Sequence, residues 1–440
     1  MFNRDFRLFH WLLAALLLSV SGLANATPKI QHWQTDNGAR VYFVPAPELP
    51  MVDVRIIFDA AAAHDKIPGT ALLTNSLLEE GAGDMNADQI ADTFAALGAQ
   101  FSTGSYRDMS VINLRSLTKP KLLDKALATT ATIISEPTFP QKALNRERKR
   151  LLIALQGNKQ SPGAIASDAF FAALYHDHPY AHDPMGTETS LPKIKRQDLI
   201  DHYRRYYVGN NAIIAIVGAL DRKQAQQLAE ELLGKLPAGK AAPPIPKVDD
   251  LKQAEVVHKD FPSSQTHLLV GQPAIKRGDP DFFPLYVGNH ILGGSGLVSR
   301  LTDVIREKRG LAYTTYSHFG PMHQRGPFQL GLQTRNNKAH KALELLKQTL
   351  VEFMQKGPTE EELQTAKKNI TGGFALTLDS NRKIVESIAM IGFYKLPLDY
   401  LDTYTQKVNA VTIKQIKQAF ARHVHPDKMA TIIVGPAEGT

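Results

Sequence analysis

The chain alternates between short runs in which every second residue is apolar and longer segments in which apolar residues recur with a helical period. Residues 39–46 and 52–59 are rich in β-branched and aromatic side chains, which predicts two successive strands. Residues 86–98 place apolar side chains on one helical stripe and end in a glycine, which predicts an amphipathic helix. Residues 101–117 alternate like a hairpin, and residues 119–135 return to helix.

Both halves of the chain end in a similar pattern. An apolar strand followed by a glycine lies in residues 210–221 (NNAIIAIVGALD) and again in residues 428–438 (KMATIIVGPAE). An amphipathic segment comes before each of these ranges. A proline-rich stretch, LPAGKAAPPIPKVDD, separates the halves. These features predict two homologous α+β domains, each an antiparallel sheet with helices on one face.

The N-terminus has the features of a secretory signal peptide. A positively charged start precedes an apolar stretch over residues 8–23 and the small residues Ala24-Asn25-Ala26. The alternative is a retained membrane anchor, but the stretch is short for a spanning helix. We expect cleavage after Ala26, no stable membrane insertion afterwards, and an exported protein.

The predicted organisation is therefore a signal peptide at 1–26, an N-terminal domain at 27–235, a linker at 236–254 and a C-terminal domain at 255–440.

Composition narrows the classes of function. The chain has 440 residues, of which 43% are hydrophobic and 21% are charged, as in ordinary globular proteins. Its formal net charge is +8, but Lys and Arg are dispersed, which favours a soluble basic surface over nucleic-acid binding. Because there is no cysteine, disulfides and thiolate metal sites are excluded, and His and carboxylates remain as zinc ligands.

Two strong hydrogen-bond donors lie on either side of a predicted helix end. A helix beginning at Ser299 carries Arg306 off its apolar stripe and stops at Gly310. The following strand is predicted to carry Tyr313, Thr315 and Ser317 on one face. On the residues alone, the simpler interpretation is that Arg306 offsets the helix dipole and that Tyr313 packs half-buried.

Several segments together resemble a known family. The blocks are PGTALLTNSLLEEGAGDMNADQIADTFAALGAQFSTGSYRD, PTFPQKALNRERKRLLIALQ, HPYAHDPMGTETSLPKI, YYVGNNAIIAIVGALD and ILGGSGLVSRLTDVIREKRGLAYTTYS. In this order they are similar to the pitrilysin/insulinase family, in its bacterial processing-peptidase-like branch. In that family a zinc site on the first domain works with an Arg and a Tyr of the second. The resemblance implies that Arg306 and Tyr313 fill those substrate-binding positions.

The chain departs from the family pattern where zinc would bind. Family peptidases carry H-x-x-E-H on a helix, and the corresponding residues here include Leu72, Asn75 and Ser76. A third ligand, Glu in the family, is replaced by Ala154. Leucine and alanine have no lone pair, Asn cannot take a proton from water, and serine is a poor zinc ligand. The resemblance therefore implies a degenerate zinc site and no cofactor bound by this chain.

One histidine cluster offers an alternative metal site. Residues 176–183 read HDHPYAHD and include an H-x-x-x-H spacing. Pro179 and its polar neighbours predict a turn, which does not place two rings on one face. We interpret the cluster as a structural loop; a standalone metalloenzyme using it is the alternative.

The resemblance implies the non-catalytic, substrate-binding subunit of a periplasmic heterodimeric zinc metallopeptidase that degrades or processes peptides. This subunit would be inactive alone and would pair with a homologous subunit that carries H-x-x-E-H and the zinc. A second hypothesis is a scaffold or peptide-binding protein with no link to hydrolysis.

Overall fold

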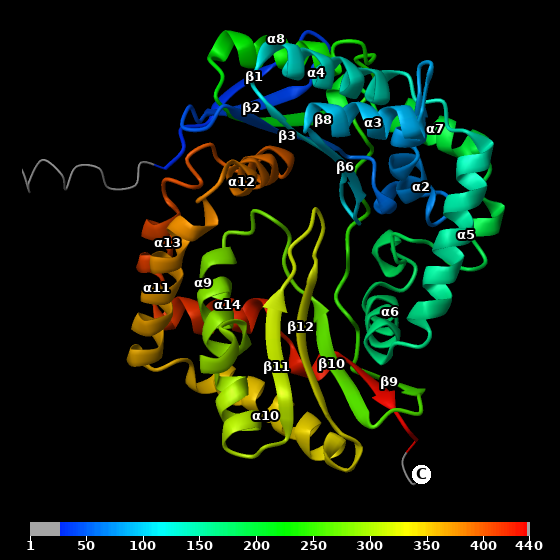
Figure 1. Ribbon diagram of the computed structural model, residues 1–440. Coiled ribbons are helices and arrows are strands. Elements are labelled where there is room, and N and C mark those ends of the chain that lie inside the picture. Colours follow the sequence, from blue (N-terminus) through cyan, green and yellow to red (C-terminus); the bar gives the residue numbers. More distant parts are fainter. Residues whose placement is uncertain (1–26, 438–440) are drawn as a thin grey trace, which may run out of the picture.

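Two β-sheets organise the chain, one in each half, in the computed structural model, which describes residues 27–437 (Figure 1). The predicted signal peptide lies outside these residues. Among the described helices, none is both long and apolar enough to cross a membrane.

The strands of the first half are β1 (Gln31–Gln34), β2 (Arg40–Pro45), β3 (Met51–Phe58), β4 (Gly81–Ala82), β5 (Met85–Asn86), β6 (Gln100–Ser105), β7 (Ser110–Leu117) and β8 (Ala212–Gly218). Its helices are α2 (Thr70–Ser76), α3 (Ala87–Leu97), α4 (Pro120–Ser135), α5 (Gln141–Asn158), α6 (Pro162–Tyr175), α7 (Arg196–Tyr206) and α8 (Arg222–Leu233).

The strands of the second half are β9 (Glu255–Asp260), β10 (Gln265–Pro273), β11 (Ala312–Phe319), β12 (Pro327–Arg335) and β13 (Ala430–Gly435). Its helices are α9 (Phe282–Asn289), α10 (Ala339–Lys356), α11 (Glu360–Gly373), α12 (Asn381–Phe393), α13 (Tyr404–Ala410) and α14 (Ile413–His423).

The two sheets share one strand order. The first sheet runs β1-β2-β8-β3-β7-β6, and the second runs β9-β13-β10-β12-β11, which is the same arrangement without an equivalent of β1. The predicted α+β class is confirmed. The sheets are not purely antiparallel as predicted, because β2 pairs with β8, and β9 with β13, in parallel. The last strand of each half returns through long helical connections, which permits parallel pairing with the first.

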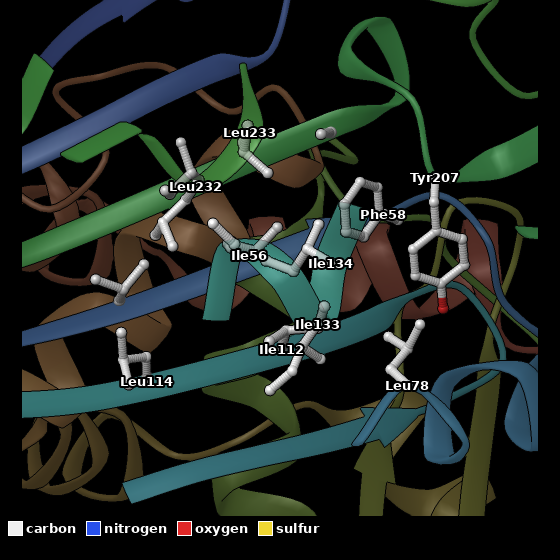
Figure 2. Packing of buried hydrophobic residues seen from close by; sticks show 14 of the residues in the cluster. Ile56, Phe58, Leu78, Ile112, Leu114, Ile133, Ile134, Tyr207, Leu232 and Leu233 are labelled. Carbon is white, nitrogen blue, oxygen red and sulfur yellow. The ribbon is translucent and has the colours of Figure 1, made fainter. Parts of the chain in front are cut away.

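Helices α3, α4 and α8 cover one face of the first sheet. Their apolar stripes meet the inward side chains of β3, β7 and β8 in a buried core (Figure 2). Figure 2 shows Phe58 beside Tyr207, whose ring centroids are 4.6 Å apart. The capping box of Asn86 and Gln89 starts α3, and Gly98 ends it with φ +61°, as the sequence pattern predicts.

The second face of each sheet is covered by a helix from the opposite half. Helix α12, although it lies late in the chain, packs on β2, β3 and β8 of the first sheet (Figure 1). Helix α6 packs on β10 and β13 of the second. The prediction that helices cover only one face of each sheet is therefore wrong. The apolar face that one half does not cover with its own helices is buried by a helix of the other half.

A buried carboxylate joins the tips of two hairpins from different halves. Asp108, between β6 and β7, is 3% exposed and accepts hydrogen bonds from the Tyr180 hydroxyl at 2.5 Å and the Tyr394 hydroxyl at 3.1 Å. It also accepts from the backbone N–H of His323, between β11 and β12, at 2.6 Å. These bonds fix the two sheets relative to each other.

The segment 236–254 contains no helix or strand but is held in place. Its apolar residues Ile245, Val248 and Leu251 are buried. The predicted domain boundaries at 235 and 254 remain predictions.

Candidate functional site

The residues at the predicted zinc-ligand positions lie on two touching helices. Leu72, Asn75 and Ser76 belong to α2, and Ala154 belongs to α5, which contacts α2. Gly69 precedes α2 with φ +100°, a conformation that favours glycine. The structure therefore brings together the two helices on which the family resemblance places the zinc-ligand positions.

Asn75, at the position predicted for a general base, has structural contacts. It is 1% exposed, and its Nδ2 donates to the carbonyl oxygens of Gly104 at 2.7 Å and Val111 at 3.2 Å. The Tyr207 hydroxyl donates to its Oδ1 at 2.9 Å. Burial raises the pKa of Tyr207, so this hydroxyl stays protonated and remains a donor. Asn75 thereby links α2 to the β6–β7 hairpin and to the end of α7.

The surroundings of α2 do not fit a zinc ion. Leu72 packs on the first core, and the Ser76 hydroxyl donates to the carbonyl oxygen of Leu73 at 3.3 Å. The Asn75 amide nitrogen offers only N–H donors, which point at two carbonyl oxygens, and its Oδ1 already accepts from the Tyr207 hydroxyl. Zinc requires lone-pair donors at tetrahedral positions, and this set does not supply them.

The carboxylates near α2 either pair with arginines or lie close to other carboxylates. Burial, followed by the neighbouring carboxylates of Glu80 and Glu147, raises the pKa of Glu79. Glu147 pairs with Arg150 at 2.7 Å and Glu80 pairs with Arg146.

The predicted helix at 299–309 is a short irregular element. A π-helical turn spans Thr302–Glu307, with Leu301 and Ile305 fully buried beneath it. Ser299 is buried, and its hydroxyl accepts from the N–H of Thr302 at 3.4 Å while donating to the Gly296 carbonyl at 2.8 Å. Gly310 ends the segment with φ +59°, in the left-handed conformation that the sequence indicated.

The prediction that Tyr313 shares a face with Thr315 and Ser317 is wrong. In the pairing of β11 with β12, Ala312 lies opposite Thr334 and Thr315 opposite Leu332, so β11 carries one extra residue. Such a bulge reverses the alternation of side chains. Thr315 and Ser317 are buried, whereas Tyr313 is 79% exposed.

The half-buried Arg306 and the exposed Tyr313 form one unit at the surface, which we call the Arg–Tyr corner. The guanidinium carbon of Arg306 lies 4.9 Å from the centroid of the Tyr313 ring. Arg306 also pairs with Glu307, with 3.2 Å between Nε and Oε1. Within residues 27–437 the Tyr313 hydroxyl has no hydrogen-bond partner. The corner thus presents a guanidinium and a free phenol to solvent.

The glycine-rich segment before the π-helical turn is closely packed at one end and exposed at the other. A Cβ on Gly293 would lie 2.5 Å from the backbone nitrogen of Ser317, so only glycine fits there. Gly296 has φ +64°, and the next residues, Leu297 and Val298, are 69% and 78% exposed. This exposed apolar pair leads directly into the turn that carries Arg306.

The histidine cluster forms a turn. Pro179–Ala181 is a 3-10 helix, and His178 uses Nε2 with the Pro246 carbonyl at 2.9 Å and accepts from the N–H of Tyr180 at 3.1 Å. In the part of the chain that the structure describes, three potential metal ligands converge only at Asp279, Asp281 and His423.

Comparison with known proteins decides the family. The model described as Insulinase (Peptidase family M16) matches residues 46–188, and the model described as Peptidase M16 inactive domain matches residues 193–370. A crystal structure titled as the peptidase M16 inactive domain from Pseudomonas fluorescens is 40% identical, with a TM-score of 0.90, over 93% of this chain and 98% of that chain. The chain belongs to peptidase family M16.

Other M16 relatives differ in what their names state. The Bacillus subtilis protein named uncharacterized zinc protease YmxG is 23% identical over 93% of this chain and 98% of its own length. The Helicobacter pylori protein named non-peptidase homolog YmxG is 27% identical over 88% of this chain and 89% of its own length. A crystal structure of a Helicobacter pylori protease, at 20% identity and a TM-score of 0.85 over 93% of this chain and all of that one, shares the fold.

Two features of this M16 chain gave no recognisable sequence signal. The role of Asn75 depends on Gly104, Val111 and Tyr207, which are distant in sequence. The buried Asp108 lies in a polar turn, and such residues are usually exposed.

Proposed function

We propose that this M16 chain is the non-catalytic, substrate-binding subunit of an exported, periplasmic two-subunit zinc peptidase. Its partner would be a homologous chain that carries H-x-x-E-H and the zinc. The observation that carries the proposal is the combination of an exposed Arg–Tyr corner with an α2 that has no ligand set. The name non-peptidase homolog given to the Helicobacter pylori relative supports a member without catalysis of its own.

The chemical role of the corner follows from its donors. Attack on a peptide carbonyl places negative charge on the carbonyl oxygen, and donors already oriented toward it lower the barrier. The Arg306 guanidinium and the Tyr313 phenol can both donate, and neither needs to break a strong bond within this chain to do so. Stacking on Tyr313 restricts the guanidinium, which reduces the entropy lost when substrate binds.

A reconstituted assembly with the zinc-bearing partner tests the proposal. We expect this chain alone to hydrolyse no peptide and the mixture to be active. Tyr313→Phe removes only a hydroxyl, so subunit association should be unchanged while kcat falls roughly a hundredfold. Arg306→Ala should lower kcat and also raise KM.

Two control variants separate the corner from its surroundings. Tyr206→Phe removes a hydroxyl elsewhere, and Arg335→Ala removes an exposed cation at the end of β12 in the same half; both should leave kcat unchanged. If the Tyr313→Phe, Arg306→Ala double variant assembles and cleaves at the unmodified rate, the corner is structural and the scaffold hypothesis replaces the proposal.

A further inference from the structure

A large pocket opens on the second half of the molecule, apart from the residues of the Arg–Tyr corner. Its volume is about 820 Å³, within the range of small-molecule sites. Three parts of the chain line it: residues 276–284 before and at the start of α9, residues 394–397 and 400 after α12, and residues of α13 and α14. We call it the α9–α13 pocket.

Aromatic rings form one wall of this pocket. Phe283 and Tyr400 line it with their ring centroids 6.1 Å apart, and Tyr404 supports them, 5.5 Å from Phe283. Tyr394 lines the pocket as well. Such a wall accepts a flat apolar group by stacking or edge contact.

Cations surround the aromatic wall. The Lys407 Nζ lies 5.7 Å from the Phe283 centroid and 5.9 Å from the Tyr400 centroid. The Arg277 guanidinium lies 5.3 Å from the Tyr394 centroid, and its Nε is buried without a hydrogen-bond partner in residues 27–437. Lys276 and Lys395 also line the pocket. Within the same described range, none of these four cations forms an ion pair.

The two acidic residues of the pocket, Asp279 and Asp281, are outnumbered by its cations and are held by other groups of this chain. The Asp281 carboxylate accepts two bonds from Arg422, at 2.7 and 2.8 Å, and His423 lies 2.9 Å from it. These partners lower the pKa of Asp281, the Arg422 hydrogen bond most of all. The Asp279 carboxylate accepts from the backbone N–H of Asp281 at 2.9 Å, at the start of α9. The charge left for a ligand is therefore positive.

We propose that the α9–α13 pocket binds an aromatic carboxylate, with the ring against Phe283 and Tyr400 and the carboxylate at Lys407 and Arg277. Phosphate fits less well, because Asp279 already occupies a backbone N–H at the start of α9 where a phosphate would bind. The carboxylate can belong to a free small acid or to the last residue of a peptide. The proposal goes beyond the proposed function and does not depend on it.

Calorimetric titration of the mature chain tests the site with matched probes. We expect 3-phenylpropionate to bind at least tenfold more tightly than each of three control probes. Acetate lacks the ring, 3-phenylpropionamide lacks the charge, and inorganic phosphate has a different anionic group. A short peptide ending in Phe should bind more tightly than its C-terminal amide if the peptide end is the source of the carboxylate. Equal affinity of the peptide and its amide, with 3-phenylpropionate still preferred, identifies the free acid as the ligand.

Variants localise the binding. Lys407→Gln should weaken 3-phenylpropionate binding about tenfold, as expected for loss of a charged hydrogen bond. Lys395→Gln provides a second variant on a different segment, expected to weaken binding severalfold. Lys121→Gln, on α4 in the other half, makes the same change in net charge and should have no effect. The proposal is overturned if 3-phenylpropionamide or inorganic phosphate binds as tightly as 3-phenylpropionate, or if the Lys407→Gln and Lys121→Gln variants bind 3-phenylpropionate alike.

Discussion

At the scale of single residues, the positions where the family resemblance predicted a degenerate zinc site have structural contacts. Asn75 lies at the position predicted for a catalytic glutamate, and its side-chain hydrogen bonds hold α2 to neighbouring elements. Replacing Asn75 with the glutamate of the peptidase motif would therefore direct a carboxylate at the carbonyl oxygens of Gly104 and Val111.

Asn75→Asp tests that bridge with a nearly isosteric change. The variant removes both N–H donors and buries a carboxylate that faces two carbonyl oxygens and keeps only the Tyr207 hydroxyl as a donor, so we expect the free energy of unfolding at pH 7 to fall by about 3 kcal/mol or more. Urea denaturation measures the change. The same substitution at the exposed Asn337 should alter stability by less than about 0.5 kcal/mol. Equal effects at the two positions would contradict a structural role for Asn75.

His202, on α7, gives stability a dependence on pH. It is buried, its Nε2 lies 2.9 Å from the Ala60 carbonyl oxygen, and burial lowers its pKa from 6.5 to about 4. Between these values the unfolded chain binds a proton that the folded chain does not, so acidification favours unfolding. The contribution of His202 is complete above pH 6.5 and is lost as the pH falls toward 4.

The expected loss from His202 alone is about 2 kcal/mol between pH 7 and pH 5. Burial of Asp65 acts in the opposite direction, since it raises that carboxyl pKa to about 7. The comparison is therefore made against His202→Gln, which keeps a donor for Ala60 but does not titrate. Urea denaturation at both pH values should show wild type losing about 2 kcal/mol more than the variant; parallel losses would show that His202 does not titrate as described.

Elements differ in how much of their structure the sequence predicts. Helices α3 and α4 and strands β2 and β3 were predictable, because their periodicity is local, and so are the cap and the glycine stop of α3. The bulge at the start of β11 was not, because it depends on how β11 aligns with β12, and the alternation of polar residues there suits either register. The exposure of Tyr313 follows from that bulge. A sequence pattern could identify the Arg–Tyr corner only through family resemblance.

At the scale of the whole molecule, each half completes the core of the other. An apolar stripe on a helix shows that one face is buried, but not which sheet covers it, so the exchange of α6 and α12 could not be predicted from periodicity. Ile388 of α12 is fully buried against strands of the first sheet. Phe170 of α6 is fully buried against the second sheet. We therefore expect the two halves to unfold as one unit.

Ile388→Ala tests this coupling with a probe in the other half. Trp33, on β1, is the only tryptophan after residue 26, and it packs on the first core with Arg222 over its ring at 4.0 Å. Removing buried methyl groups should lower the free energy of unfolding by about 2–4 kcal/mol. Because α12 closes the first sheet, the Trp33 fluorescence midpoint in urea should shift together with the far-ultraviolet circular dichroism midpoint. Ile153→Ala, at a position 60% exposed on α5, should shift neither. If Ile388→Ala leaves the Trp33 transition in place while the circular dichroism develops a second, earlier step, the halves unfold separately and α12 is not a shared structural element.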